Sequence, residues 1–406
     1  MIKTALREER KRLIAQAQTI IIKVGSAELA SDSGLNRELI NSLASQIAQI
    51  RALFPPREKE GTRKIVVVSS GAVAAGRSAL LSINKASFSN PKKARHGLAS
   101  IGQGLLMHAW HNAFAPHNIL TGQVLLTRED LRARTRFHFA SDTFSEMLQW
   151  GVIPIVNEND TVSVMGLNFG DNDYLASLLV NLVGANLFVN LTSSSAVMNG
   201  KPDSGVSVEP IRYLEDIRHL DIESLCGAAT KSGSGGMQSK LLAARRVSQL
   251  GVPTLILPGK QPGILLQAFQ DACGTADDSS IDLGTWICPS EKTVSRRKFW
   301  LAYQSPPAGV VEIDAGAARA LLREGRSLLP GGIINVKGNF DSGELLLITH
   351  EGKNLGVGFS NYSSVDLSQI RNLKRHEVAA ILGKARYPDV IHRDNLLLDA
   401  AIGIES

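Results

Sequence analysis

Residues 63–77 read RKIVVVSSGAVAAGR, and this stretch decides the fold class. The run 65–68 is continuously apolar and β-branched, which predicts a strand buried on both faces. Ser69, Ser70 and Gly71 then predict a turn, and the alanine-rich segment that follows predicts a helix. A buried strand that leads directly into a helix is typical of a parallel sheet covered by helices.

The same alternation continues along the chain. Other short apolar runs of the strand type are TIIIKVG (19–25), ILTGQVLLT (119–127), VIPIVNEND (152–160), ANLFVNLTSS (185–194) and VPTLILPG (252–259). Segments with helical spacing lie between them, such as NRELINSLASQIAQIRAL (36–53), TFSEMLQWG (143–151), DNDYLASLLVNLVG (171–184) and SKLLAARRVSQLG (239–251). The sequence therefore predicts an α/β protein with a mainly parallel central sheet sandwiched by helices.

Polar clusters follow several of these strands. They are Gly25-Ser26, Ser69-Ser70-Gly71, Asn157-Glu158-Asn159-Asp160 and Thr192-Ser193. Because ligands of parallel sheets bind beyond the carboxyl ends of the strands, we expect these clusters to line a binding site.

The sequence pattern changes after about residue 285. Short strands there alternate with Gly, Pro and Asn-Asp turns, which predicts a small, mostly-β second domain. Residues 1–17 are mixed in charge and helical in pattern, and they lack the apolar core and cleavage site of a signal peptide. No apolar run is long enough to cross a bilayer, so no membrane association is expected.

The composition is typical of a soluble globular protein, with 44% hydrophobic and 20% charged residues. The net charge of +6 raises the question of nucleic-acid binding. However, residues 291–406 hold 15 Lys and Arg against 13 Asp and Glu, and no basic block stands out, which favours an enzyme that handles anions. Three cysteines without a Cys-x-x-Cys pair argue against disulfides and zinc, and indicate a cytoplasmic protein.

The stretch GSGGMQSKLLAA (233–244) places three glycines ahead of Lys240. It is not the phosphate loop of P-loop NTPases, because the spacing is wrong and Leu241 stands where a Ser or Thr should hold Mg²⁺. Its glycines still allow backbone N–H groups to approach an anion at a helix start, and Lys240 adds a positive charge. A glycine-rich helix entry without any ligand is the alternative.

Two other features strengthen the anion interpretation. Lys23 lies inside an apolar strand, where a buried ammonium needs a partner, although a solvent-facing edge position is the alternative. The block NENDTVSVMGLNFGDNDYLA (157–176) is the densest polar stretch in the chain, although Asp171 alone is best explained as a helix cap. Lysines early and late with carboxylates between them are what phosphoryl transfer uses.

Eight motifs, which follow one another in the family's order, resemble those of the glutamate 5-kinase family. Its members are amino acid kinases with a C-terminal PUA domain. The motifs are IIKVGSAEL, VVVSSGAVAAGR, ASIGQGLLMHAW, GQVLLTREDLRARTRF, GVIPIVNENDTV, FGDNDYLASLLVNLVGA, GSGGMQSKLLAA and PPAGVVEIDAGAARALL. The resemblance covers the chain from about Thr19. It implies an N-terminal helical extension (1–17), an amino acid kinase domain (18–288) and a PUA-like domain (295–390).

The resemblance implies ATP-dependent phosphorylation of the side-chain carboxylate of L-glutamate, with Mg²⁺, as the first step of proline biosynthesis. Lys23 and Lys240 would then flank the transferring phosphoryl group, and Asp173 would orient both lysines. The residues that would bind glutamate are Ser70, Asp160 and Asn172. Those that would bind ATP are Lys23, Thr192, Ser193, Ser234, Gly235, Gly236, Met237, Gln238, Ser239 and Lys240.

The family further implies a homo-oligomer, a dimer or a tetramer, and proline as a feedback inhibitor. One segment departs from the family pattern. Ser193 replaces an aspartate, and Ala196, Val197 and Met198 replace Gly-Leu-Tyr in the segment that would line the nucleoside. We therefore expect weaker or less base-selective nucleotide binding.

Two rival functions stay open at this point. One is a PUA-type RNA-binding or regulatory protein with a degenerate kinase fold. Counting against it are the near-neutral C-terminal part and the intact Lys23, Asp160, Asn172, Asp173 and Lys240. The other is a related kinase for another small carboxylate, carbamate or phosphonate, against which the matched polar block counts. Nucleic acid is thus not an expected partner.

Overall fold

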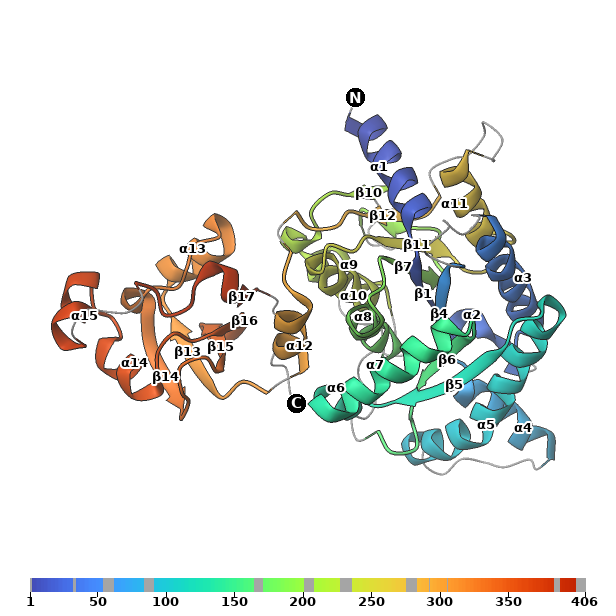
Figure 1. Cartoon of the computed structure of the whole chain (residues 1–406), viewed down its shortest axis with the longest axis horizontal. Coiled ribbons are helices and arrows are strands. Elements are labelled where there is room, and N and C mark those ends of the chain that lie inside the picture. The colour runs from blue at the N-terminus through green and yellow to red at the C-terminus, as the bar shows by residue number, and fades with distance from the viewer. Residues whose placement is uncertain are drawn as a thin grey trace. The chain divides into compact units, whose positions relative to one another are not determined.

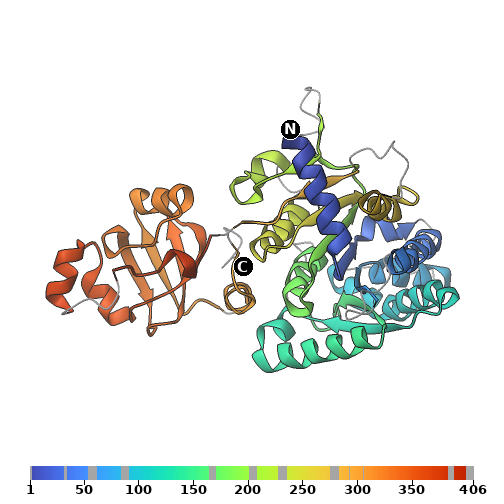
Figure 2. The same ribbon diagram turned by 45° about the horizontal axis from the view of Figure 1, so that its top comes forward.

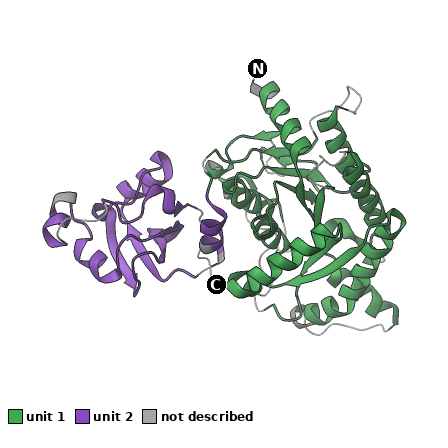
Figure 3. Cartoon of the chain, viewed as in Figure 1, with its two compact units in different colours: residues 1–293 green, residues 294–406 purple. Residues whose placement is uncertain are grey.

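The computed structural model describes residues 2–31, 34–53, 62–83, 91–163, 171–200, 208–226, 236–274, 283–291, 293–304, 306–382 and 388–398 of the chain. The chain divides into two compact units, Met1–Thr293 and Val294–Ser406 (Figure 3). The finer domain limits expected from the sequence, 1–17, 18–288 and 295–390, stay predictions. None of the helices in the described ranges combines the length and the apolar character that crossing a membrane requires.

The first unit is built on an eight-stranded sheet (Figure 1). Its strands, in spatial order, are β10 (Tyr213–Leu214), β12 (Thr285–Ile287), β11 (Thr254–Pro258), β7 (Leu187–Thr192), β1 (Thr19–Val24), β4 (Lys64–Ser69), β6 (Ile153–Glu158) and β5 (Thr121–Leu126). Only the β11–β12 pairing is antiparallel. The mainly parallel sheet expected from the sequence is confirmed.

Helices cover both faces of this sheet (Figures 1 and 2). One layer contains α1 (Ile2–Gln16), α3 (Arg37–Leu53), α4 (Ala72–Ile83), α5 (Pro91–Phe114) and α11 (Ile264–Cys273). The other contains α6 (Arg128–Arg132), α7 (Arg134–Gln149), α8 (Asp171–Val183), α9 (Ile222–Cys226) and α10 (Met237–Gln249). The remaining elements are short: α2 (Ser26–Leu29), β2 (Ala30–Ser31), β3 (Gly34–Leu35), β8 (Val197–Met198), β9 (Pro210–Ile211), and the 3₁₀ turns η1 (Ala115–His117) and η2 (Ile217–His219).

The strand β1 shows how the apolar pattern divides between the two layers. Ile20, Ile22 and Val24 join the core beneath the layer of α3 and α5. Since side chains alternate along a strand, Lys23 faces the opposite layer, where α8 and α10 lie. In the sheet register Lys23 pairs with Asn190 of the neighbouring strand β7. Both polar side chains therefore lie beneath α8 and α10.

The helices α4 and α5 touch through their backbones because glycines leave room. A Cβ atom on Gly102 would overlap the carbonyl oxygen of Ala72, and one on Gly76 would overlap that of Leu98. Ahead of α4, Gly71 adopts a φ of 114°, which side chains rarely allow. These glycines set where Ser70, two residues before α4, and Gln103, on α5, come to lie.

The second unit contains a five-stranded sheet with helices around it (Figure 1). Its strands, in spatial order, are β14 (Ile333–Gly338), β13 (Gly309–Ile313), β15 (Leu345–His350), β16 (Lys353–Phe359) and β17 (Leu396–Leu397). The accompanying helices are α12 (Arg296–Gln304), α13 (Ala315–Glu324), α14 (Ser364–Ile370), α15 (Arg375–Ile381), η3 (Pro330–Gly332) and η4 (Arg393–Asn395). A separate apolar core, which includes Val311, Leu346 and Ile348, fills this unit. The expected mostly-β second domain is confirmed.

Candidate active site

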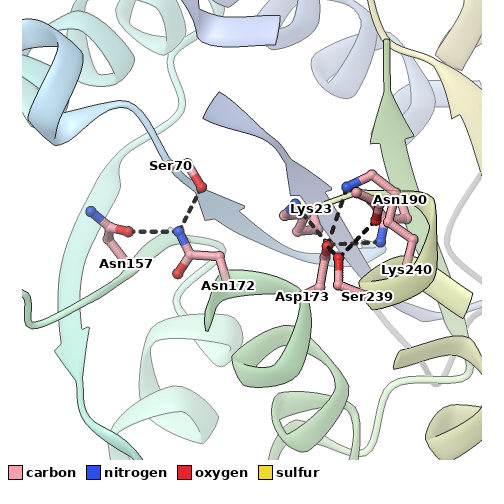
Figure 4. A network of polar contacts seen from close by, with 9 residues as sticks. Lys23, Ser70, Asn157, Asn172, Asp173, Asn190, Ser239 and Lys240 are labelled. Carbon is pink, nitrogen blue, oxygen red and sulfur yellow. Dashed lines mark hydrogen bonds and ion pairs between the residues drawn. The ribbon is translucent and has the colours of Figure 1, made fainter. Parts of the chain in front are cut away.

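A buried ion-pair triad joins β1, α8 and α10 of the first unit (Figure 4). The side chain of Asp173, in the first turn of α8, is fully buried. Its Oδ1 lies 2.7 Å from Nζ of Lys23 on β1, and its Oδ2 lies 3.2 Å from Nζ of Lys240 on α10. Three residues far apart in the sequence, each predicted to be catalytic, thus meet at one carboxylate.

Two neutral donors complete the surroundings of Asp173. Nδ2 of Asn190 donates to Oδ1 at 3.0 Å, and the hydroxyl of Ser239 donates to Oδ2 at 2.6 Å. Each carboxylate oxygen therefore accepts from one ammonium group and one neutral donor. Arg246 of α10 also stacks over the ring of Tyr174 at 4.6 Å, which provides a second link between α10 and α8.

The charges of the triad do not cancel. Burial alone raises the pKa of Asp173, but the ammonium groups of Lys23 and Lys240 and the hydrogen bonds to Asp173 outweigh burial and hold its pKa well below the usual range. Burial lowers the pKa of Lys23, the Asp173 carboxylate opposes this, and the Lys240 ammonium lowers it further. Two ammonium groups sharing one carboxylate leave an excess positive charge, which suits the binding of an anion.

A chain of amide and hydroxyl groups begins beside the triad, at the residue that precedes Asp173 on α8 (Figure 4). Nδ2 of Asn172 donates to Oγ of Ser70 at 2.7 Å and to Oδ1 of Asn157 at 2.9 Å. Nδ2 of Asn157 in turn donates to Oε1 of Gln103 at 2.9 Å. Within the part of the chain that the structure describes, the Oδ1 atom of Asn172 and the Nε2 atom of Gln103 are buried without a hydrogen-bond partner. This hydrogen-bonded series of side chains, the polar chain, thus keeps one acceptor and one donor for a polar ligand.

The Ser70 end of this chain is held by an indole. Nε1 of Trp110 donates to Oγ of Ser69 at 2.8 Å, and Oγ of Ser69 donates to the carbonyl oxygen of Ser70 at 3.0 Å. Trp110 is fully buried on α5, so it fixes the turn that follows β4.

Asp160 lies just beyond the end of β6, mostly buried. Its Oδ1 lies 3.8 Å from Nη2 of Arg95, and its backbone carbonyl accepts a hydrogen bond from the ring of His96. Burial raises the pKa of Asp160, whereas Arg95 and His96 act in the opposite direction. Within the described ranges, no hydrogen bond joins Asp160 to Ser70 or Asn172.

The expected ATP-binding residues fall in two places. Ser234 and Gly235 lie outside the described residues, whereas Gly236 precedes α10, and Met237, Gln238, Ser239 and Lys240 form its first turn. Among the described residues, no side chain caps the N-terminus of α10, so its first N–H groups are available to an anion. Thr192 ends β7, and its carbonyl oxygen accepts from the N–H of Gly259 at 2.8 Å.

The segment that departs from the family pattern follows directly on Thr192. Ser193 is exposed, whereas Ala196 and Val197 are fully buried. The N–H of Val197 donates to Oγ1 of Thr285 at 2.9 Å, and Met198 pairs with Pro210 across β8 and β9. Within this segment, Ser193 is thus a side chain that a ligand can reach.

Two contact residues, Asn190 and Gln103, were missed from the sequence. Asn157 belongs to a polar cluster that was expected to line the site, although no role was assigned to it. A single asparagine inside the apolar run 187–191 was the available signal for Asn190, since a buried amide needs a partner. Within the described residues, no group of three or more His, Cys, Asp or Glu side chains comes together as a metal site.

Residues 18–258 match the amino acid kinase family, and residues 309–382 match the PUA domain. The chain belongs to the amino acid kinase family. As in other kinases of this family, ATP is the phosphoryl donor, and the fold expected from the motifs is confirmed.

Among the amino acid kinases, the glutamate 5-kinases are similar to this chain over nearly its whole length. The glutamate 5-kinase of Nitratidesulfovibrio vulgaris strain DP4 is 50% identical over 396 residues, covering 97% of this chain and 99% of its own. That of Maridesulfovibrio salexigens is 48% identical, with the same two coverages, 97% and 99%. That of Thermus thermophilus is 40% identical, covering 94% of this chain and 97% of its own. The resemblance to the glutamate 5-kinases is therefore confirmed.

Proposed function

We propose that the protein transfers the γ-phosphoryl group of ATP to the side-chain carboxylate of L-glutamate, giving L-glutamyl 5-phosphate, the first step of proline biosynthesis. The observation that carries this proposal is the buried triad, in which Asp173 holds Lys23 at 2.7 Å and Lys240 at 3.2 Å. Support comes from glutamate 5-kinases that are 38–50% identical to the chain.

The triad suits a reaction whose nucleophile is already charged. A carboxylate oxygen of glutamate attacks phosphorus, the bond from phosphorus to the β–γ bridging oxygen breaks, and ADP leaves. No general base is required, because the carboxylate of glutamate is ionised at neutral pH. This agrees with Asp173, whose oxygens are occupied by four donors. Lys23 and Lys240 supply fixed positive charge where negative charge spreads over the phosphoryl oxygens.

The neighbouring polar chain suits an amino acid. We assign the ammonium group of glutamate to the carboxylate of Asp160 and to Oδ1 of Asn172, a buried acceptor without a partner. Ser70 then lies against the same ligand, because it is hydrogen-bonded to Asn172. Since Asn172 and Asp173 are consecutive, α8 positions the acceptor substrate and the transfer triad together.

The N-terminus of α10 suits the phosphates of ATP. Backbone N–H groups near Gly236 and Met237 and the positive end of the helix dipole favour anions there. The residues also fit Mg²⁺ that arrives with ATP, because the fully paired carboxylate of Asp173 cannot compete for the ion. When bound with ATP, Mg²⁺ would supply further charge neutralisation.

Several properties are proposed on the family resemblance alone. They are a homo-oligomeric state, either dimer or tetramer, proline as a feedback inhibitor, and a cytoplasmic location. Glutamate-binding roles for Ser70, Asp160 and Asn172, and ATP-binding roles for Thr192, Ser193, Ser234 and Gly235, belong to the same proposal.

An ADP-release assay tests this function. ADP release by the purified chain should depend on glutamate, and Lys240→Ala should lower kcat by at least about a hundredfold because a preorganised charge at the transition state is lost. Lys64→Ala is the matched control, because Lys64 begins β4 at the opposite, amino edge of the sheet. Glutamate-independent ADP release, or a fully active Lys240→Ala enzyme, would contradict the proposal. Filter binding of bulk tRNA to the same preparation tests the RNA-binding alternative.

A further inference from the structure

Glu28 is a buried carboxylate that the proposed mechanism does not use. It lies in α2, the short helix that follows β1 directly, and only 2% of its surface is exposed. Within the described ranges of the chain it makes no hydrogen bond or close ion pair, although its negative charge acts on the nearby ammonium group of Lys23 and raises the pKa of that group. A buried carboxylate without a hydrogen bond or a close ion pair is costly, so a ligand that supplies further positive charge would relieve that cost.

The glycine at position 25 shows where this carboxylate points. A Cβ atom built on Gly25 would overlap Oε2 of Glu28 and would lie 3.5 Å from Nζ of Lys23. The carboxylate and the catalytic ammonium group therefore flank the same side of Gly25. Only glycine leaves this space open, since any other residue would fill it with its own side chain.

The stem of Glu28 is held at the carboxyl ends of three neighbouring strands. A Cβ atom on Gly259, just beyond β11, would lie 3.0 Å from Cγ of Glu28 and 3.1 Å from Cβ of Leu191 in β7. Glu28 itself follows the end of β1. These three strands are adjacent in the sheet, so Glu28 lies at the edge where the phosphoryl group is transferred.

The chemistry of this position favours a metal cation as the missing partner. Lys23 is paired with Asp173 at 2.7 Å, so the single charge of Lys23 is shared between Asp173 and Glu28 and does not neutralise both carboxylates. The phosphates of ATP are anionic, and a bare carboxylate beside them would repel them. Mg²⁺ prefers oxygen ligands and is usually held by one or two carboxylates together with phosphates. Asp173 accepts from four donors, which leaves Glu28 as the carboxylate beside Lys23 that can take this role.

We propose that Glu28 binds the divalent cation that accompanies ATP, and so joins the metal to the transfer triad. This inference rests on the proposed function only in taking ATP as the substrate. It makes nucleotide affinity depend on the metal in two ways. With the cation present, Glu28 attracts the metal–nucleotide complex, whereas without it the same carboxylate repels the bare phosphates.

Calorimetric titration with the non-hydrolysable analogue AMPPNP tests the proposal without any turnover. The measured quantity is the ratio of the Kd in EDTA to the Kd in excess Mg²⁺. We expect Glu28→Gln, which keeps the shape and removes the charge, to reduce this ratio at least about tenfold, roughly one good charged contact. The metal-free Kd should stay unchanged or decrease. Glu38→Gln, an exposed glutamate in the first turn of α3, should leave the ratio at the wild-type value.

The alternative is that Glu28 merely positions Lys23. Glu28→Gln would then weaken binding equally with and without Mg²⁺, the ratio would stay constant, and the proposal would be wrong. Glu28→Asp keeps the charge but shortens the side chain, and it should reduce the ratio by an intermediate factor. Thermal unfolding of each variant shows that the fold is retained. Because these titrations contain no glutamate, a failure of glutamate-dependent ADP release would overturn the proposed function and leave this inference standing.

Discussion

At the residue scale, the site is organised around the saturation of one carboxylate. Lys23 and Asn190 bind one oxygen of Asp173, and Lys240 and Ser239 bind the other. A carboxylate held this way has neither a free lone pair for a proton nor a rotamer to change into. It acts as a fixed negative charge that keeps two ammonium groups in place.

Asp173→Asn should destabilise the first unit and abolish efficient turnover. Two buried ammonium groups then face a neutral amide, and breaking a buried ion pair costs about 3 kcal/mol or more. Because the pKa of Asp173 is depressed in the folded state, its stabilisation is present above its unfolded pKa of about 3.9 and is lost as the pH falls through the lower folded value.

Chemical denaturation of the wild type and of Asp173→Asn between pH 3 and 7 measures how the stabilisation by Asp173 depends on pH. The difference in the free energy of unfolding should be largest near neutral pH and should shrink below about pH 4. A difference that stays constant across this range would show that Asp173 is not the buried anion of the triad.

Asp160→Asn should weaken glutamate binding and stabilise the fold at neutral pH. The KM for glutamate should rise at least about tenfold and much more than the KM for ATP, because the carboxylate that faces the ammonium group is lost. The pKa of Asp160 is raised in the folded state, so its contribution to stability is full below its unfolded pKa and is lost as the pH rises through the folded value.

The free energy of unfolding of Asp160→Asn should therefore exceed that of the wild type at pH 7, and the gain should vanish near pH 3. Steady-state kinetics with each substrate varied in turn gives the two KM values. If both KM values move together, Asp160 has a structural role at the end of β6.

The double change Ser193→Asp and Met198→Tyr should strengthen nucleotide binding. Ser193 is exposed directly after β7, and a carboxylate there can accept hydrogen bonds from a ribose. Each added hydrogen bond or contact contributes about 1 kcal/mol, a few-fold to tenfold in affinity. Calorimetry with ATP and GTP measures affinity and base preference. Unchanged values for both nucleotides would mean that the base is held elsewhere.

At the element scale, the approach of α4 to α5 decides where two polar side chains lie. Gly102 and Gly76 allow the backbones to touch, and Gln103 follows Gly102 directly. Gln103 accepts a hydrogen bond from Asn157, which is linked through Asn172 to Ser70. A shift of α5 would therefore displace this whole hydrogen-bonded series. Two glycines outside the site therefore control the geometry of the site.

Gly102→Ala should destabilise the first unit by about 3 kcal/mol, the upper range for overpacking, because its methyl group overlaps the Ala72 carbonyl. Gly104→Ala is the matched control on the same helix, since its Cβ would meet no atom within 4 Å. It should be neutral or stabilising by about 0.5–1 kcal/mol. Thermal unfolding compares the two variants, and equal stabilities would contradict the close contact.

The elements could be predicted from the sequence much further than the contacts between them. Continuous runs such as 65–68 identify buried strands because burial on both faces leaves no polar alternation. Lys23 and Asp173 were found through their polarity within apolar or helical patterns and through the family resemblance. Asn190 was not found, because its role depends on β1 lying beside β7. Local sequence patterns do not predict the order of strands in a sheet. Gln103 was missed for the same reason.

At the scale of the whole molecule, and among the described residues, the apolar clusters of the first unit share no residue with the cluster that fills the second unit. The triad and the polar chain lie in the first unit, whereas Val311, Leu346 and Ile348 belong to the core of the second. Substitutions in the core of the second unit should thus change the stability of that unit without changing the catalytic chemistry of the first unit.

Leu346→Ala should destabilise the second unit by about 3 kcal/mol, because it leaves a cavity at a fully buried position. Calorimetry of the full chain should show one transition shifted to lower temperature. The kcat and both KM values should stay within about twofold of the wild type, since no residue of the triad or the polar chain belongs to the second unit. A large loss of activity at temperatures where the second unit stays folded would show that it supports catalysis.

The central place of β1 has a consequence for synthesis on the ribosome. Among the strands of the large sheet, β1 emerges first, yet its second neighbour β7 is made only after β4, β5 and β6. At roughly 5–20 residues per second, one edge of the TIIIKV strand waits about ten seconds or longer for its partner. An unpaired apolar edge is a template for pairing with other chains. Nascent chains of this protein should therefore depend on chaperones until residue 192 has emerged.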